Sequence, residues 1–132
     1  MEFKLDQYED VMVINVYLTR ATLKHAGKFK DFVFSIINSG WKKVIVDLSA
    51  SEYIDSTFMG GLVAALKKLV SSEGDLRLIY SSKASMIFDL TGMNRVFKIH
   101  TSLEDALKGF SVTIDQKKII PKGIPNNKFK FR

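Results

Sequence analysis

Cysteine is absent from the 132-residue sequence, and proline occurs only twice. Without cysteine the chain has no disulfide, no thiol nucleophile and no cysteine-ligated metal, and its composition is compatible with a reducing compartment. No apolar run approaches the roughly eighteen residues that a membrane-spanning helix needs. The first residues, Met1 to Asp6, lack the basic start and the apolar middle of a signal peptide. We therefore expect a cytoplasmic protein with no membrane span.

The familiar catalytic motifs are missing as well. The sequence contains neither a phosphate-binding loop that ends in Gly-Lys-Ser/Thr nor a Gly-x-Ser-x-Gly elbow. The two histidines, His25 and His100, fall on separate predicted elements, which argues against a zinc site or a nucleophilic triad. Asp47 and Asp55 bracket a loop and can be interpreted as an acid–base pair or a magnesium site, but turn and helix-start roles explain both better. The sequence predicts no enzyme, no metal and no cofactor.

Positive charge is concentrated at the C-terminal end. Residues 111–132 carry six Lys or Arg against one Asp, whereas residues 1–110 carry 14 basic against 13 acidic groups. This division predicts a nearly neutral domain over 1–110 and a basic extension over 111–132, and we expect no direct DNA binding by the domain. The ending Lys128–Arg132 alternates basic and aromatic residues, a pattern that fits contact with single-stranded nucleic acid or an anionic membrane. A solvated tail or an edge strand is the favoured interpretation.

The hydrophobic periodicity alternates between strand and helix along the chain, and 132 residues suffice for one domain with a continuous core. Strands are predicted at 3–7, 11–17, 44–48, 76–80 and 96–99, and helices at 22–38, 56–70, 84–90 and 102–110. The first two strands read as an antiparallel hairpin. The pattern predicts an α/β fold, with one mixed and mostly parallel sheet and about four helices packed mainly on one side.

One stretch, residues 44–62, organises the remaining interpretation. A buried strand ends at Asp47, an irregular loop follows, and Asp55-Ser56-Thr57 opens a helix. Asp55 or Ser56 can cap this helix, which places Thr57 in the first turn with its hydroxyl near the surface. A phosphoryl group there would face the helix dipole and spare N–H donors. The alternative, which the local pattern alone favours, is that Thr57 is a helix-capping threonine with no chemistry.

The order of elements and several motifs resemble the STAS domain of bacterial anti-sigma-factor antagonists. The resemblance covers residues 3–110. Its most specific parts are the Asp55-Ser56-Thr57 helix start and the later runs Phe88-Asp89-Leu90-Thr91-Gly92, Phe97-Lys98-Ile99 and Ser102-Leu103-Glu104-Asp105-Ala106-Leu107. In that family the residue after Asp-Ser is a serine or threonine that a partner-switching kinase phosphorylates.

The resemblance implies a regulatory role with Thr57 as the phosphorylated residue. The unphosphorylated protein would bind an anti-sigma factor serine/threonine kinase and thereby free a sigma factor, which regulates transcription. Phosphorylation would end the binding, and a phosphatase acting on phospho-Thr57 would restore it. A partner-binding surface is expected around the phosphorylation site, formed by Asp55, Ser56, Phe58, Met59 and Gly60.

Two sequence positions differ from the usual family pattern. Phe58 stands where the family usually has glycine, and Leu18 to Thr22 contains Arg20 in place of a Gly-Glu-Leu-Asp-like segment. We expect Phe58 and Met59 to contact a partner at the surface, with burial in the core as the alternative, which is stronger for Met59. An alternative function is a non-phosphorylated STAS scaffold in a stress-sensing or lipid-transport complex, and a catalytic role ranks third.

Overall fold

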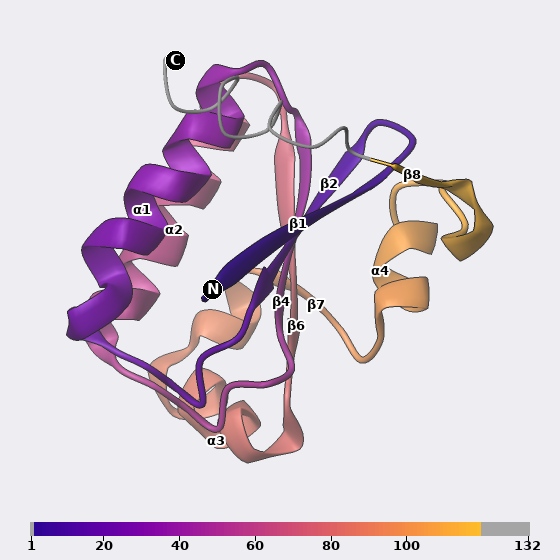
Figure 1. Cartoon of the computed structure of the whole chain (residues 1–132). Helices are drawn as coiled ribbons and strands as arrows, with labels where there is room; N and C mark the ends of the chain where they lie inside the picture. Colours follow the sequence, from indigo (N-terminus) through magenta and orange to yellow (C-terminus); the bar gives the residue numbers. More distant parts are fainter. Residues whose placement is uncertain (1, 120–132) are drawn as a thin grey trace.

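The computed structural model describes residues 2–119 and folds as a mixed sheet with helices on both faces (Figure 1). The six-stranded sheet has the order β7-β6-β4-β2-β1-β8, and β3 and β5 form a separate two-stranded sheet. The strands are β1 (Phe3–Tyr8), β2 (Val11–Val16), β3 (Arg20–Ala21), β4 (Lys43–Leu48), β5 (Tyr53–Ile54), β6 (Asp75–Tyr80), β7 (Lys98–His100) and β8 (Lys117–Lys118). The helices are α1 (Leu23–Asn38), α2 (Ser56–Ser71), α3 (Ser82–Thr91) and α4 (Leu103–Lys108), with short 3-10 turns at Met93–Arg95 and Ile114–Gln116.

The centre of the sheet is parallel because each central strand is followed by a helix that returns the chain to the same end. Strands β2, β4, β6 and β7 pair in parallel, and β4 lies in the middle with β2 on one side and β6 on the other. Val44, Ile45 and Val46 of β4 are fully buried, as expected for a strand that is covered on both faces. The predicted hairpin is also present, since β1 and β2 pair antiparallel over their whole length.

Helices α1 and α2 lie side by side on one face of the sheet (Figure 1). Their inner sides meet the sheet in the larger of two hydrophobic clusters, which also takes in Ala84 and Phe88 of α3. The rings of Phe29 in α1 and Phe58 in α2 stack with their centroids 4.6 Å apart. Three helices therefore share one face, as predicted.

Helix α4 covers the other face, with a smaller cluster beneath it. Leu107 and Phe110 pack there against residues such as Val13, Ile45 and Ile79 from three neighbouring strands. Arg77 lies over the ring of Phe110, with 4.7 Å between its guanidinium carbon and the ring centroid. A polar contact thus forms part of this thinner layer.

The predicted fold class is confirmed, and the differences lie in short elements. Residues 93–95 form a 3-10 turn, so the last strand of the parallel set begins at Lys98 instead of Val96. Ile114–Gln116 forms another 3-10 turn, and the chain then adds β8 antiparallel to the edge strand β1. The domain boundary at residue 110 stays a prediction, although Val112 is buried against the sheet. Lys128–Arg132 lies outside the described residues.

Candidate functional site

The starts of helices α1 and α2 are joined by one carboxylate. Asp55 caps α2, because its Oδ1 accepts a hydrogen bond of 2.8 Å from the backbone N–H of Phe58. Its Oδ2 accepts a second bond of 2.8 Å from the backbone N–H of Leu23, the first residue of α1. Helix α1 has no cap of its own, since the side chain of Thr22 makes no capping bond. Asp55 therefore fixes the positions of two helix N-termini relative to each other.

The loop that leads to Asp55 is held by two serines. The Oγ of the fully buried Ser51 donates a hydrogen bond of 2.6 Å to the carbonyl oxygen of Leu18. Ser81, the cap of α3, donates a bond of 2.8 Å to the carbonyl oxygen of Ser51. These bonds tie the loop to the ends of two other strands, so the start of α2 rests on a rigid support.

Thr57 is the second residue of α2, and its side chain is exposed, as is that of Ser56. Within residues 2–119 the backbone N–H groups of Ser56 and Thr57 have no hydrogen-bond acceptor, as is usual in the first turn of a helix. The first turns of α1 and α2 also contain no acidic residue. The site accordingly combines an accessible hydroxyl with two free N–H donors at the positive end of the α2 dipole, next to the Asp55 carboxylate that caps the helix.

Phe58 and Met59, which the sequence analysis places on the partner-contacting surface, are buried. The side chain of Phe58 is 0% exposed and that of Met59 5% exposed. The expectation that Phe58 contacts a partner at the surface is therefore wrong, and for Met59 the alternative of burial in the core, which was the stronger one, is the correct one. The physical reason is the helical repeat: positions 58, 59, 62, 65 and 69 share the face of α2 that meets the sheet and α1. Phe58 anchors the start of α2 in the core, and its buried ring does not cover the exposed side chain of Thr57.

The neighbouring glycines serve different purposes. A Cβ at Gly61 would lie 3.9 Å from the ring of Phe29 and 4.0 Å from the carbonyl oxygen of Ala26, so Gly61 lies at the contact between the two helices. Gly60 is exposed, and a Cβ there would meet nothing within 4 Å.

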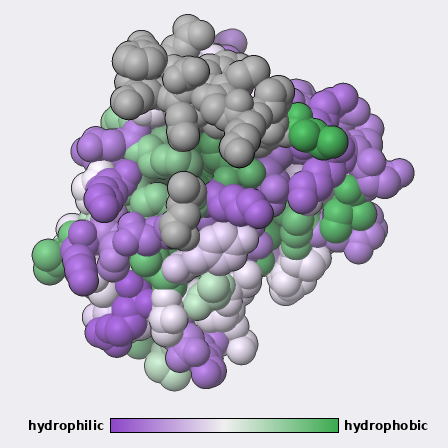
Figure 2. Space-filling view, in the orientation of Figure 1, coloured by the Kyte–Doolittle hydropathy of each residue, from purple (hydrophilic) through white to green (hydrophobic). Residues whose placement is uncertain are grey.

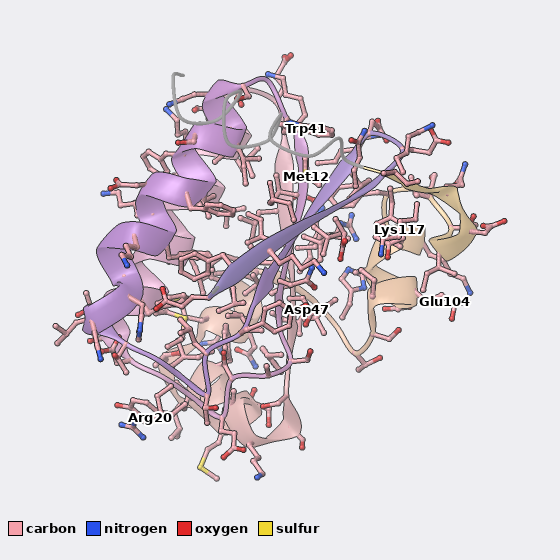
Figure 3. The ribbon with its side chains drawn as sticks, viewed as in Figure 1. Met12, Arg20, Trp41, Asp47, Glu104 and Lys117 are labelled. Atoms are coloured by element: carbon pink, nitrogen blue, oxygen red, sulfur yellow. The ribbon has the colours of Figure 1, made fainter. Side chains whose placement is uncertain are left out.

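Two short strands place an arginine beside the helix starts. Arg20 in β3 pairs with Tyr53 in β5, and its guanidinium carbon lies 4.4 Å from the centre of the Tyr53 ring. Figure 3 shows Arg20 at the lower end of the molecule, where the chain enters α1, and far from Glu104 on the opposite side of the sheet. The sequence analysis missed this contact, because two-residue strands carry no detectable periodicity.

The family is decided by a comparison with known domains. The family model described as "STAS domain" matches residues 3–106 of the chain, which is more than half of its length. The chain belongs to the STAS domain family. The predicted resemblance is thus confirmed, and the match spans every element from β1 to the first four of the six residues of α4.

Several relatives of this STAS domain are known. A protein of Thermotoga maritima named "Putative anti-sigma factor antagonist" is 32% identical over 101 residues, which cover 75% of this chain and 89% of the relative. A crystal structure of a protein so named from the same organism has a TM-score of 0.74 at 29% identity, covering 81% of this chain and 92% of the other. The Bacillus cell fate determinant SpoIIAA in its phosphorylated form shares the fold, with a TM-score of 0.63 at 16% identity, covering 82% of this chain and 98% of the other.

The other polar candidates in this STAS domain have structural partners. The Oδ1 of Asp47 accepts a bond of 2.9 Å from the backbone N–H of Ser49, which makes Asp47 a turn residue, as predicted. Nδ1 of His100 lies 2.7 Å from a carboxylate oxygen of Asp105 at the start of α4. Among residues 2–119 no group of three His, Cys, Asp or Glu side chains could hold a metal ion. None of the helices in the same range is long and apolar enough to cross a membrane.

Proposed function

We propose that this STAS domain is an anti-sigma factor antagonist that binds an anti-sigma kinase and is switched off by phosphorylation at Thr57. The observation that carries the proposal is the exposed Thr57 hydroxyl in the first turn of a helix that Asp55 holds in place. The naming of the Thermotoga relatives supports the antagonist role. The proposal assigns no reaction to this chain, which acts as substrate and binding partner.

The chemistry of the switch is a transfer of one phosphoryl group. The bound kinase moves the γ-phosphoryl group of ATP to Oγ1 of Thr57, ADP leaves, and the hydroxyl proton passes to a base of the kinase. A phosphatase then hydrolyses the phosphothreonine with water to restore the hydroxyl. The new group brings about −1.5 to −2 charges and three acceptor oxygens to the start of α2.

The expected effect of the phosphate follows from its position. The free N–H groups of Ser56 and Thr57 and the positive end of the α2 dipole are suited to stabilise the phosphate on the domain itself. A partner surface docked over the site would instead meet a bulky dianion. Because Phe58 anchors the helix start in the core, the phosphate can block binding without a change of fold.

Intact-mass spectrometry tests the proposal. The native chain is incubated with ATP, magnesium and each candidate anti-sigma kinase of its genome, beside Thr57→Ala and the control Ser56→Ala, which removes the neighbouring exposed hydroxyl. We expect one added phosphate on the native chain and on Ser56→Ala, and none on Thr57→Ala. Phosphate on Thr57→Ala would contradict the assignment, and its loss only in Ser56→Ala would move the site by one residue.

A second candidate is a non-phosphorylated scaffold module in a stress-sensing or lipid-transport complex. The contact between Arg20 and Tyr53 favours it, because it places a cation and an aromatic ring on an exposed surface next to the helix starts. In this case partner release would not respond to ATP, and Thr57→Ala would bind the partner as tightly as the native chain. Size-exclusion chromatography of the complex, with and without ATP, separates the two candidates.

A further inference from the structure

The charges of helices α1 and α2 are nearly all of one sign. Together the two helices carry five lysines against the single carboxylate of Asp31, a net charge of +4. Outside these helices, residues 1–110 carry nine basic and twelve acidic groups, so the rest of the domain is negative. We name the outer surface of α1 and α2 the helix-lysine face; its lysines are Lys24, Lys28, Lys30, Lys67 and Lys68.

Within residues 2–119 none of these five lysines has a carboxylate within 4 Å, whereas five of the eight lysines on other elements do. Across residues 2–119, five lysines lie within 4 Å of a carboxylate, and all five belong to other elements. The pairs are Lys43–Asp10, Lys83–Glu52, Lys98–Asp75, Lys117–Asp6 and Lys118–Glu9. The positive charge of the helix-lysine face is therefore not neutralised within the described chain, and it remains available to a partner.

The arrangement also works against the stability of the helices. Lys24 and Lys28 are four residues apart on α1, where like charges repel each other along the helix. Lys30 from α1 and Lys68 from α2 both approach the ring of Phe34, with their Nζ atoms 5.4 and 5.1 Å from its centroid. Two cations thus converge on one ring, and the positive surface continues from one helix to the other.

Exposed aliphatic side chains accompany the charges. Leu23, at the start of α1, is 70% exposed, and Val70, near the end of α2, is 57% exposed. Figure 2 shows hydrophilic side chains with hydrophobic ones among them along the left side of the molecule, where Figure 1 places α1. Basic side chains interspersed with exposed aliphatic ones are typical of surfaces that lie on a lipid interface.

The type of cation narrows the choice of partner. The helix-lysine face contains no arginine, the residue that makes bidentate contacts and is enriched in protein interfaces, where lysine is depleted. It also lacks the exposed aromatic rings on which single-stranded nucleic acids stack, since Phe34 is half-buried between two lysines. Lysines act as point charges, which suit a diffuse array of anions. We propose that the helix-lysine face binds the anionic surface of a lipid bilayer.

This role goes beyond the antagonist function and does not depend on it. The lysines are attracted to anionic headgroups, and at moderate salt the attraction is largely screened beyond about 10 Å. Leu23 enters the headgroup region beside Lys24 and adds apolar contact. Binding is therefore reversible and sensitive to salt, as expected for a peripheral attachment without a membrane-spanning helix.

Vesicle sedimentation with the full chain tests this proposal. Vesicles of phosphatidylcholine with phosphatidylglycerol are compared with vesicles of phosphatidylcholine alone. The test variant is Lys24→Gln/Lys28→Gln/Lys30→Gln. The control, Lys83→Gln/Lys98→Gln/Lys118→Gln, removes the same charge from other surfaces, and both variants keep residues 120–132 unchanged. Circular dichroism confirms that both are folded.

We expect the native chain to bind only the anionic vesicles. The test variant should lose at least about tenfold in partition coefficient, while the control stays within about twofold of the native chain. Equal losses in both variants would mean that net charge alone acts, and would overturn the proposal. No binding by the native chain, or full binding by the test variant, would overturn it as well. The proposal would also be overturned if the native chain bound a DNA duplex more tightly than the vesicles and the test variant lost that DNA binding. This result would identify a nucleic-acid surface.

Discussion

On one side of the sheet, α1 and α2 cover a deep core and expose lysines for which residues 2–119 provide no carboxylate partner. On the other side, α4 covers a smaller core, and the nearby Lys98 and Lys117 each lie beside an aspartate. Apolar packing thus stabilises the first side, which leaves its polar surface free for partners. The second side supplements its packing with ion pairs and hydrogen bonds, which consume the polar groups that a binding surface would need.

The largest expected effect concerns the two cores. Phe58→Ala should lower the free energy of unfolding by about 3–5 kcal/mol, because the ring is fully buried and stacked on Phe29. Phe110→Ala, on the α4 side, should cost less, since its ring is 9% exposed and packs partly on Arg77. Guanidinium chloride unfolding of both variants measures the difference. Equal losses would show that the two cores contribute alike.

Helix caps provide the next comparison. Asp55→Ala should lower the free energy of unfolding by about 2 kcal/mol, because it removes a cap from α2 and an acceptor from the start of α1. Ser102→Ala removes the cap of α4 alone and should cost about 1 kcal/mol or less. The same unfolding assay applies. A larger loss for Ser102→Ala would contradict the role of Asp55 as the joint between two helices.

Replacing either of two glycines by alanine should change the free energy of unfolding, in opposite directions. Gly60→Ala should raise the free energy of unfolding by about 0.5–1 kcal/mol, because the added Cβ meets nothing within 4 Å of its position on α2. Gly109→Ala should lower it, because the Cβ would overlap the guanidinium of Arg77, which is held by Phe110 and by His100. Thermal melts followed by circular dichroism suffice. Stabilisation by Gly109→Ala would mean that Arg77 moves freely.

The smallest effect is a dependence on alkaline pH. Burial raises the pKa of Tyr8 above its usual 10.0, with Asp6 raising it further and Lys117 opposing the shift. Because the folded state holds this proton more tightly, the stabilisation is complete below pH 10 and is lost as the pH rises through the higher pKa of the folded state. The free energy of unfolding, measured with denaturant between pH 9 and 11, should therefore fall more steeply with pH for the native chain than for Tyr8→Phe. Parallel slopes would show no contribution from Tyr8.

Much of the fold was predictable because its signals are local. The apolar run 44–48 indicates a buried strand, and the helical spacing after Ser56 indicates α2, whatever the rest of the chain does. The cap at Asp55 could be predicted for the same reason, since the acceptor and the N–H of Phe58 are three residues apart. The two-residue strands β3 and β5 could not, because so short a segment has no period.

The surface was harder to predict than the fold. The burial of Phe58 depends on which side of α2 faces Phe29 in another helix. The second bond of Asp55 joins residues 32 positions apart, so no local pattern indicates it. The total charge of the first 110 residues, +1, likewise conceals a helix layer with a net charge of +4.

The sequence by itself determined the STAS fold, the order of its elements and the exposed threonine in the first turn of α2, because hydrophobic periods and helix caps act over a few residues. Tertiary structure alone decided that two helix starts share Asp55, that Phe58 lies in the core and that five lysines with no carboxylate partner in residues 2–119 share one surface. Those features depend on distances between side chains that lie far apart in the sequence, and such distances are set only when the helices pack on the sheet.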